Sequence, residues 1–150
     1  MKIEEKINES IKDSMKKKDN VRLDSLRAIK SAILIEKTKS GSKDHIEESV
    51  ILKILQKMVK QRNDSAQIYL EQKRDELANV EMSQADIISE FLPAQLSESD
   101  LSEIIDKVIT DIGADSMKDM GKVISVVTEK VSGQAEGRVI AEIVKRKLMG

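Results

Sequence analysis

Apolar residues recur at intervals of three and four along most of the chain, and this spacing restricts its fold more than any other feature. The clearest example runs from Ile46 through Val50 and Ile54 to Met58. Such spacing gathers apolar side chains on one side of an α-helix, whereas a half-buried strand needs apolar and polar residues to alternate. No segment keeps that alternation for more than a few residues. The sequence therefore predicts an all-α protein.

The only proline, Pro93, separates two parts of different composition. Four of the six glycines lie in the short stretch from Gly113 to Gly137. Proline and glycine interrupt regular structure, so the two parts are built differently and a boundary is expected near Pro93. We expect an N-terminal helical domain over residues 1–93 and a C-terminal three-helix domain over residues 94–150.

The N-terminal part is expected to form four helices. Its first helix has an apolar residue at every fourth position: Ile3, Ile7, Ile11 and Met15. Asp19 or Asn20 is expected to cap the second helix, and Asp44 the third, because short polar side chains accept hydrogen bonds from free amides at helix starts. The third helix should continue beyond residue 65, and the fourth should end near Phe91.

The C-terminal part contains stronger start and stop signals. Ser97 is expected to cap a helix that ends at Gly113. Ser116 and Asp119 have the spacing of a capping box for the next helix, which Gly133 should close. A final helix then follows to the end of the sequence.

The composition excludes several chemistries. The chain has no cysteine and one histidine, His45, so disulfides, zinc fingers and paired imidazole ligands are excluded. His45 falls in a polar loop and receives no role. Neither common glycine-rich nucleotide motif is present. We therefore expect no cofactor, no metal site and no catalytic residue.

Charges interrupt the first residues every few positions, which argues against a signal peptide or membrane span and favours a cytoplasmic protein.

One group of basic residues lies in the C-terminal part. Lys118 and Lys122 fall close together on a helix, opposite its apolar side, and therefore face outward. The glycine-bearing turn that follows, with Arg138, adds backbone amides and a further cation. These groups suit phosphate contact, although outward lysines also serve solubility.

A second group lies in the N-terminal part. Arg62, within the segment KQRNDS, continues the apolar side of its helix, and we favour an ion pair with an acid on a neighbouring helix over a ligand site. Residues 12–43 contain ten Lys or Arg against four Asp or Glu. The candidates for a second basic site are Arg22, Arg27, Lys60 and Arg62.

Several motifs together resemble the GatB/YqeY family along essentially the whole chain. They are RLDSLRAIKSAI from Arg22, KQRNDS from Lys60, EFLPAQLSESDL from Glu90, SMKDMGKVI from Ser116 and KVSGQAEGRVIAEIVK from Lys130. Phe91, where the family often has Tyr, and Glu136, where Asp is frequent, are mild departures. The segment from Lys73 to Ala78 lacks a glycine that the family pattern leads us to expect near that turn.

The resemblance implies a C-terminal domain similar to the tail of the B subunit of the tRNA-dependent amidotransferase, an appended tRNA-binding module. It makes the following residues the candidates for tRNA binding: Lys118, Lys122, Lys130, Gly133, Gly137 and Arg138. The expected function is that of a non-catalytic tRNA-associated protein, with tRNA and an aminoacyl-tRNA synthetase or amidotransferase as partners. One alternative is a protein-interaction module that docks on a synthetase or on itself. A weaker alternative is a carbon-nitrogen ligase that uses glutamine as amido donor.

Overall fold

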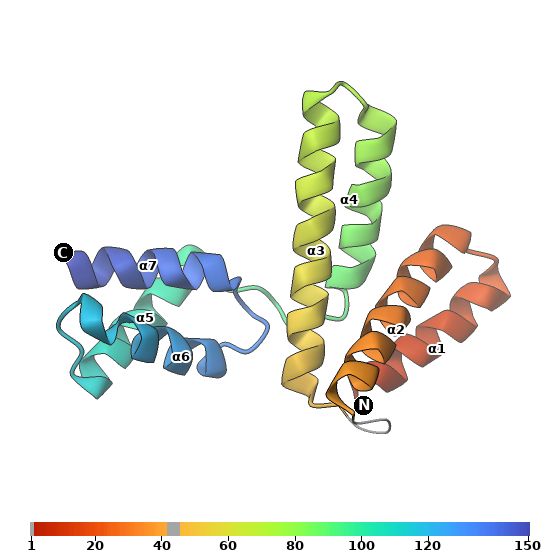
Figure 1. Ribbon diagram of the computed structural model, residues 1–150. Helices are drawn as coiled ribbons and strands as arrows, with labels where there is room; N and C mark the ends of the chain where they lie inside the picture. The colour runs from red at the N-terminus through yellow and green to blue at the C-terminus, as the bar shows by residue number, and fades with distance from the viewer. Residues whose placement is uncertain (1, 42–45) are drawn as a thin grey trace. The chain divides into compact units, whose positions relative to one another are not determined.

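The computed structural model describes residues 2–41 and 46–150, which form helices and no strand, and the all-α class is confirmed (Figure 1). Backbone contacts divide the chain into two compact units, Met1–Leu92 and Pro93–Gly150. The helices of the first unit are α1 (Ile3–Lys17), α2 (Asn20–Ser40), α3 (Glu48–Glu71) and α4 (Asp75–Ser89). The second unit contains α5 (Glu98–Ile112), the 3₁₀ helix η1 (Met117–Asp119), α6 (Met120–Lys130) and α7 (Gly137–Met149). Within the described ranges, no helix is both long enough and apolar enough to cross a membrane.

The N-terminal unit consists of two helical hairpins, α1 with α2 and α3 with α4 (Figure 1). Its core lies where the first hairpin packs on the start of α3 and the end of α4. The buried residues of this core are Ile3, Ile7, Leu26, Ile29, Ile33, Ile51, Leu55, Met58 and Ile88. Helices thus bury the apolar stripes that the sequence spacing predicts.

The outer part of the second hairpin extends beyond the first hairpin (Figure 1). We call residues 65–82 the helical arm. Within the arm the buried contacts come from small residues, Ala66 and Ala78, while Ile68, Leu77 and Val80 are exposed. Short side chains allow two helix backbones to approach closely. The arm is therefore held by close helix packing and carries its larger apolar side chains on its surface.

The expected apolar side of α1 is correct at its start and wrong at its end. Ile3 and Ile7 are buried, but Met15 is exposed and Ser14 is buried in its place. Each step of four residues turns an α-helix by about 40° beyond a full turn. Three such steps move Met15 far from the side that carries Ile3, and Ser14 turns inward. The fourth helix also ends at Ser89, slightly before the expected Phe91.

At the starts of two helices in the N-terminal unit, polar side chains accept hydrogen bonds from free backbone amides. Asp19 caps α2, because its carboxylate accepts a hydrogen bond from the Arg22 amide at 3.1 Å. The start of α1 has no such residue, and the Ile3 amide donates instead to Glu48 of α3 at 3.0 Å. Glu48 therefore ties the two hairpins together. The expected cap Asp44 lies outside the described residues, as does His45, and Glu47 occupies the N-cap position of α3.

The connection from α3 to α4 forms without a glycine. Lys73 takes the left-handed conformation with φ of 59°. Its amide donates to the Leu70 carbonyl at 3.0 Å, and the Arg74 amide donates to the Tyr69 carbonyl at 2.8 Å. This pair of bonds is a Schellman motif, which glycine usually completes because a Cβ atom is strained in that conformation.

Replacing Lys73 by glycine should therefore stabilise the protein. We expect Lys73→Gly to raise the free energy of unfolding by about 0.5–1 kcal/mol, measured by urea denaturation. The matched control is Lys57→Gly, within α3, which should lower it by about 0.5–1 kcal/mol. Equal destabilisation by both substitutions would contradict the assignment of strain to Lys73.

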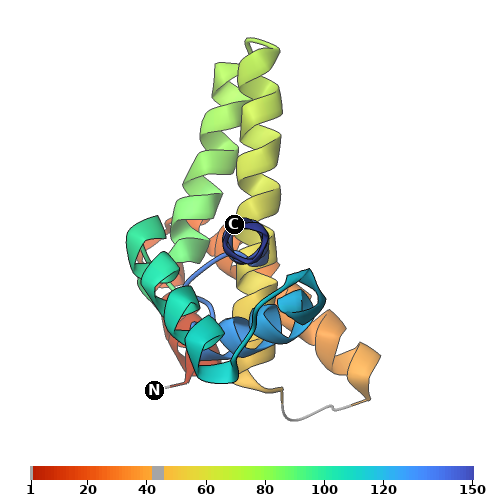
Figure 2. The same ribbon diagram turned by 90° about the vertical axis from the view of Figure 1, so that its left-hand side faces the viewer.

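The C-terminal unit packs α5, α6 and α7 around one core, with α7 seen nearly end-on as the dark blue helix in Figure 2. The buried residues of this core are Leu101, Ile105, Val108, Val123, Val127, Val131, Ile140, Ile143 and Val144. Ser97 caps α5 by accepting from the Asp100 amide at 3.0 Å, and Gly113 ends it with φ of 68°. Both features agree with the sequence signals.

The expected capping box at Ser116 does not form. Residues Met117–Asp119 form the 3₁₀ turn η1, and α6 begins only at Met120. The Asp119 carboxylate accepts from the Asp115 amide at 3.1 Å and closes the preceding loop. The Ser116 hydroxyl is buried without a hydrogen-bond partner among the described residues. Ser116 has an extended backbone and occupies the N-cap position of η1, but its side chain accepts no hydrogen bond from a backbone amide of that turn.

Independent folding of the C-terminal unit remains a prediction. Because this unit has its own core and its own helix caps, we expect residues 94–150 expressed alone to keep helical structure. Far-ultraviolet circular dichroism with a cooperative thermal transition would support this. A fragment without helical signal would show that the unit depends on the rest of the chain.

Candidate nucleic-acid interface

The turn between α6 and α7 is held by the segment that precedes α5. The Leu96 amide donates to the Gln134 carbonyl at 2.9 Å. The Gln95 side-chain amide donates to the Gly133 carbonyl at 2.8 Å, and Gln134 donates to the Ala94 carbonyl at 3.4 Å. These bonds fix the position from which α7 starts.

The two glycines of this region, both candidate contacts, have different roles. Gly133 has φ of 77°, a conformation that glycine adopts without strain, so the turn itself accounts for it. Gly137 is the first residue of α7, and a Cβ atom added there would meet no atom within 4 Å. Packing therefore does not require glycine at position 137, and the backbone there is open to approach.

The predicted lysines of the C-terminal unit all face outward. Lys118 lies in η1, Lys122 in the first turn of α6 and Lys130 at its end, and each is exposed. None of the three side chains has a hydrogen bond or ion pair within the part of the chain that the structure describes. Arg138 is exposed as well, with Glu136 at 4.0 Å. An exposed pair at that distance contributes little energy, so all four cations are available to a ligand.

Charge is unevenly distributed within the C-terminal unit. Helix α5 carries five acidic residues and a single basic one, Lys107. Residues 117–149, which include α6 and α7, carry seven basic and four acidic residues. Positive potential therefore concentrates on the elements that follow α5.

Two cations of α7 pair with the acids of α5. Arg146 lies 3.2 Å from Glu98, and Lys147 lies 2.7 Å from Asp106. Lys145, which directly precedes them in sequence, is exposed, and its side chain has no such partner among the described residues. Lys145 is not among the binding residues expected from the sequence. Its spacing of seven residues from Arg138, which places both on one side of α7, is the signal that could have identified it.

Arg62 of the second basic group supports the contact between α3 and α4. Its Nε donates to the Gln84 side-chain carbonyl at 3.1 Å, and its Nη1 donates to the Met58 carbonyl at 3.3 Å. The expected partner on a neighbouring helix is present, but it is an amide and not an acid. The half-buried guanidinium thus donates to two uncharged oxygen acceptors.

The other members of this group are divided between paired and unpaired residues. Arg22 forms an ion pair with Glu90, which joins the start of α2 to the residue that follows α4. Lys60 pairs with Asp64 on the same helix at 2.7 Å. Arg27 is exposed and lacks such a partner within the described ranges. Three of the four candidates thus have contacts within the protein, which favours a structural role for them.

The pair of Arg22 and Arg27 allows this role to be tested. We expect Arg22→Gln to lower the free energy of unfolding by about 0.5–1 kcal/mol, because it removes a partly buried ion pair. Arg27→Gln should change it by less than about 0.5 kcal/mol. Thermal denaturation of both variants checks this, and an Arg22 variant as stable as the wild type would return Arg22 to the candidate binding residues.

Within the described residues, no three or more His, Cys, Asp or Glu side chains gather closely enough to hold a metal ion. The candidate functional features of this region are the exposed cations and the open start of α7. They define the class as a small all-α protein of two helical units with a cationic surface on its second unit.

Comparison with known proteins identifies the family. The family model described as "Yqey-like protein" matches residues 4–148, and the chain belongs to this family. The expected relationship to YqeY-type proteins is thereby confirmed.

Curated relatives come from fungi and bear the name "Altered inheritance of mitochondria protein 41, mitochondrial". The Clavispora lusitaniae protein is 33% identical over 69% of this chain and 61% of its own length. The Kluyveromyces lactis protein is 26% identical over 71% of this chain and 58% of its own length. The Pyrenophora tritici-repentis protein is 23% identical over 95% of this chain and 77% of its own. In the first two, the match therefore spans less than two thirds of the relative.

Proposed function

We propose that this protein is a non-catalytic accessory factor that binds tRNA through its C-terminal unit. The observation that carries the proposal is the set of exposed cations on η1, α6 and α7 that lack close ion pairs. Lysine and arginine that no acid neutralises attract phosphates, and this attraction supplies most of the sequence-independent affinity for nucleic acids. The acidic helix α5 would restrict the contact to the surface formed by the other elements.

The chemistry of this surface favours contact with the RNA backbone over contact with bases. Residues 93–150 contain no Phe, Tyr or Trp, so this unit offers no ring on which an unpaired base could stack. Four of the five available cations are lysines, which act as point charges toward phosphate. We therefore infer that the unit contacts a double-helical part of tRNA through phosphates, without reading its sequence.

The lysines Lys118 and Lys122 provide the test. We expect the double variant Lys118→Gln/Lys122→Gln to reduce tRNA affinity and to flatten the slope of log affinity against log salt by about 1.4–1.8, since each lost phosphate contact contributes roughly 0.7–0.9. Stability should change by no more than about 0.5 kcal/mol per site, because both side chains are exposed. Fluorescence anisotropy with labelled tRNA at several salt concentrations measures this slope.

A matched control distinguishes a local contact from a general effect of charge. Lys53 and Lys57 are also exposed lysines four residues apart, on α3. Lys53→Gln/Lys57→Gln removes the same charge and should leave affinity and slope near those of the wild type. If both double variants behave alike, or if neither changes binding, the lysines of η1 and α6 do not contact tRNA.

A second candidate function rests on a different observation. The helical arm exposes Ile68, Leu77 and Val80, and exposed apolar groups favour protein contacts. A module that docks on a synthetase, on an amidotransferase or on itself would use such a surface. This candidate replaces the first if the lysine variants bind tRNA as the wild type does.

The proposal assigns no reaction to the chain. The carbon-nitrogen ligase activity associated with the family resemblance belongs to portions of the amidotransferase that 150 residues do not contain. For location we propose the cytoplasm. The fungal relatives are named as mitochondrial proteins, and a compartment of that kind, which holds its own tRNA, would suit the same binding function.

A further inference from the structure

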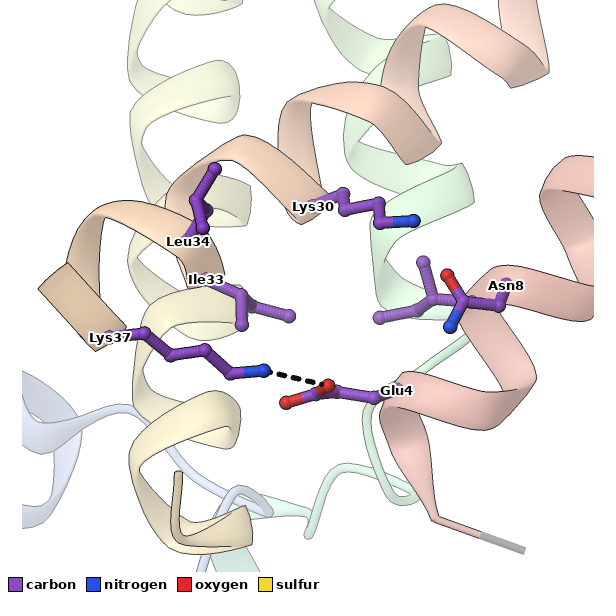
Figure 3. Close-up of a pocket in the computed structure, with 7 residues that line it drawn as sticks. Glu4, Asn8, Lys30, Ile33, Leu34 and Lys37 are labelled. Atoms are coloured by element: carbon purple, nitrogen blue, oxygen red, sulfur yellow. Dashed lines mark hydrogen bonds and ion pairs between the residues drawn. The ribbon is translucent and has the colours of Figure 1, made fainter. Parts of the chain in front are cut away.

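A pocket of about 120 Å³ lies between α1 and α2 in the N-terminal unit (Figure 3). Its apolar lining includes Ile7 and Ile33, whose side chains are buried and belong to the core of the unit, and the exposed Leu34. Figure 3 shows the polar side chains of Asn8 from α1 and Lys30 from α2 extending toward the space between the helices. The pocket thus combines an apolar lining with polar groups from both helices.

An ion pair forms part of the pocket lining. Lys37 of α2 lies 3.1 Å from Glu4 of α1, and the Lys37 side chain is only 17% exposed. This pair links the two helices beside the Asn8 side chain (Figure 3). Because the two charges neutralise each other, neither determines the net charge of the pocket.

Lys30 is the charge that remains. The positions three and four residues away on α2 hold Leu26, Arg27, Ile33 and Leu34, so no acid on its own helix can reach it. The Lys30 ammonium group has no hydrogen bond or ion pair within the described residues. An unpaired ammonium above an apolar surface favours an anion that also has an apolar part.

We propose that this pocket binds a small aliphatic carboxylate. Lys30 would pair with the carboxylate, the Asn8 amide would donate to its second oxygen, and the aliphatic part would cover Ile7, Ile33 and Leu34. An apolar cavity of roughly 150 Å³ can hold benzene, so a pocket of about 120 Å³ suits a branched chain of four or five carbons. This site lies in the N-terminal unit, and the proposal is independent of tRNA binding.

Titration of the full-length protein with sodium isovalerate tests the proposal. Methyl-resolved NMR at constant ionic strength follows the methyl groups of Ile7, Ile33 and Leu34. We expect saturable shifts at these methyls, with a Kd on the order of 10 mM for a ligand of so few atoms. The neutral analogue isoamyl alcohol has the same branched chain and should bind at least about tenfold more weakly, because it lacks the charge that Lys30 recognises.

Two variants complete the test. Lys30→Gln should weaken isovalerate binding about tenfold, and unchanged methyl signals elsewhere will show that the fold is intact. The control Lys57→Gln removes an exposed lysine from α3, away from the pocket lining, and should leave binding unchanged. Shifts that stay linear to about 100 mM, equal binding of the alcohol, or equal binding by the Lys30 variant would each overturn the proposal.

Discussion

Burial of one apolar stripe per helix is the interaction on which the structure depends. The chain has no cysteine that could form a disulfide, so the two units rely on packing. Ile7, Leu26, Leu55 and Ile88, drawn from all four helices of the first unit, are almost fully buried. Burial of each such side chain contributes about 1.5–3 kcal/mol, and truncation to alanine typically costs 2–5 kcal/mol. Polar contacts such as Glu48 with the Ile3 amide then fix how the helices meet.

The helical arm buries small side chains in place of large apolar ones. Where α3 and α4 extend beyond the first hairpin, the buried residues among those described are alanines. Ala66 and Ala78 allow the two helices to pack closely without a large core. Residues 65–82 bury no side chain larger than alanine, and they expose Ile68, Leu77 and Val80.

In the second unit, the distribution of charged residues decides which cations are paired and which stay exposed. Acids on α5 hold Arg146 and Lys147 of α7, and the remaining cations of η1, α6 and α7 stay exposed. The net charge of the whole chain is only -1, so the composition gives no indication of a polyanion-binding surface. Helix α5 carries five of the ten acids of residues 93–150 and only one cation. This uneven distribution allows part of a nearly neutral protein to be positive, because electrostatic attraction depends on local charges within about a Debye length.

Sequence alone determined the class of fold, most helix positions and the absence of disulfides within the chain, which has no cysteine. Spacing of three and four residues implies helices wherever it occurs, and caps such as Asp19, Ser97 and Gly113 act through bonds within one helix end. The outward direction of Lys122 also followed from spacing, because the apolar side of α6 leaves it only the solvent.

Tertiary structure decided which charges are available and where a pocket lies. Arg22 meets Glu90 and Arg62 meets Gln84 across long sequence separations, which no periodicity reveals. The pocket beside Lys30 exists only because α1 packs against α2 with Asn8 and Glu4 facing it. Helical spacing fixes which side of a helix a residue occupies, but the partner on that side depends on how helices distant in sequence pack together.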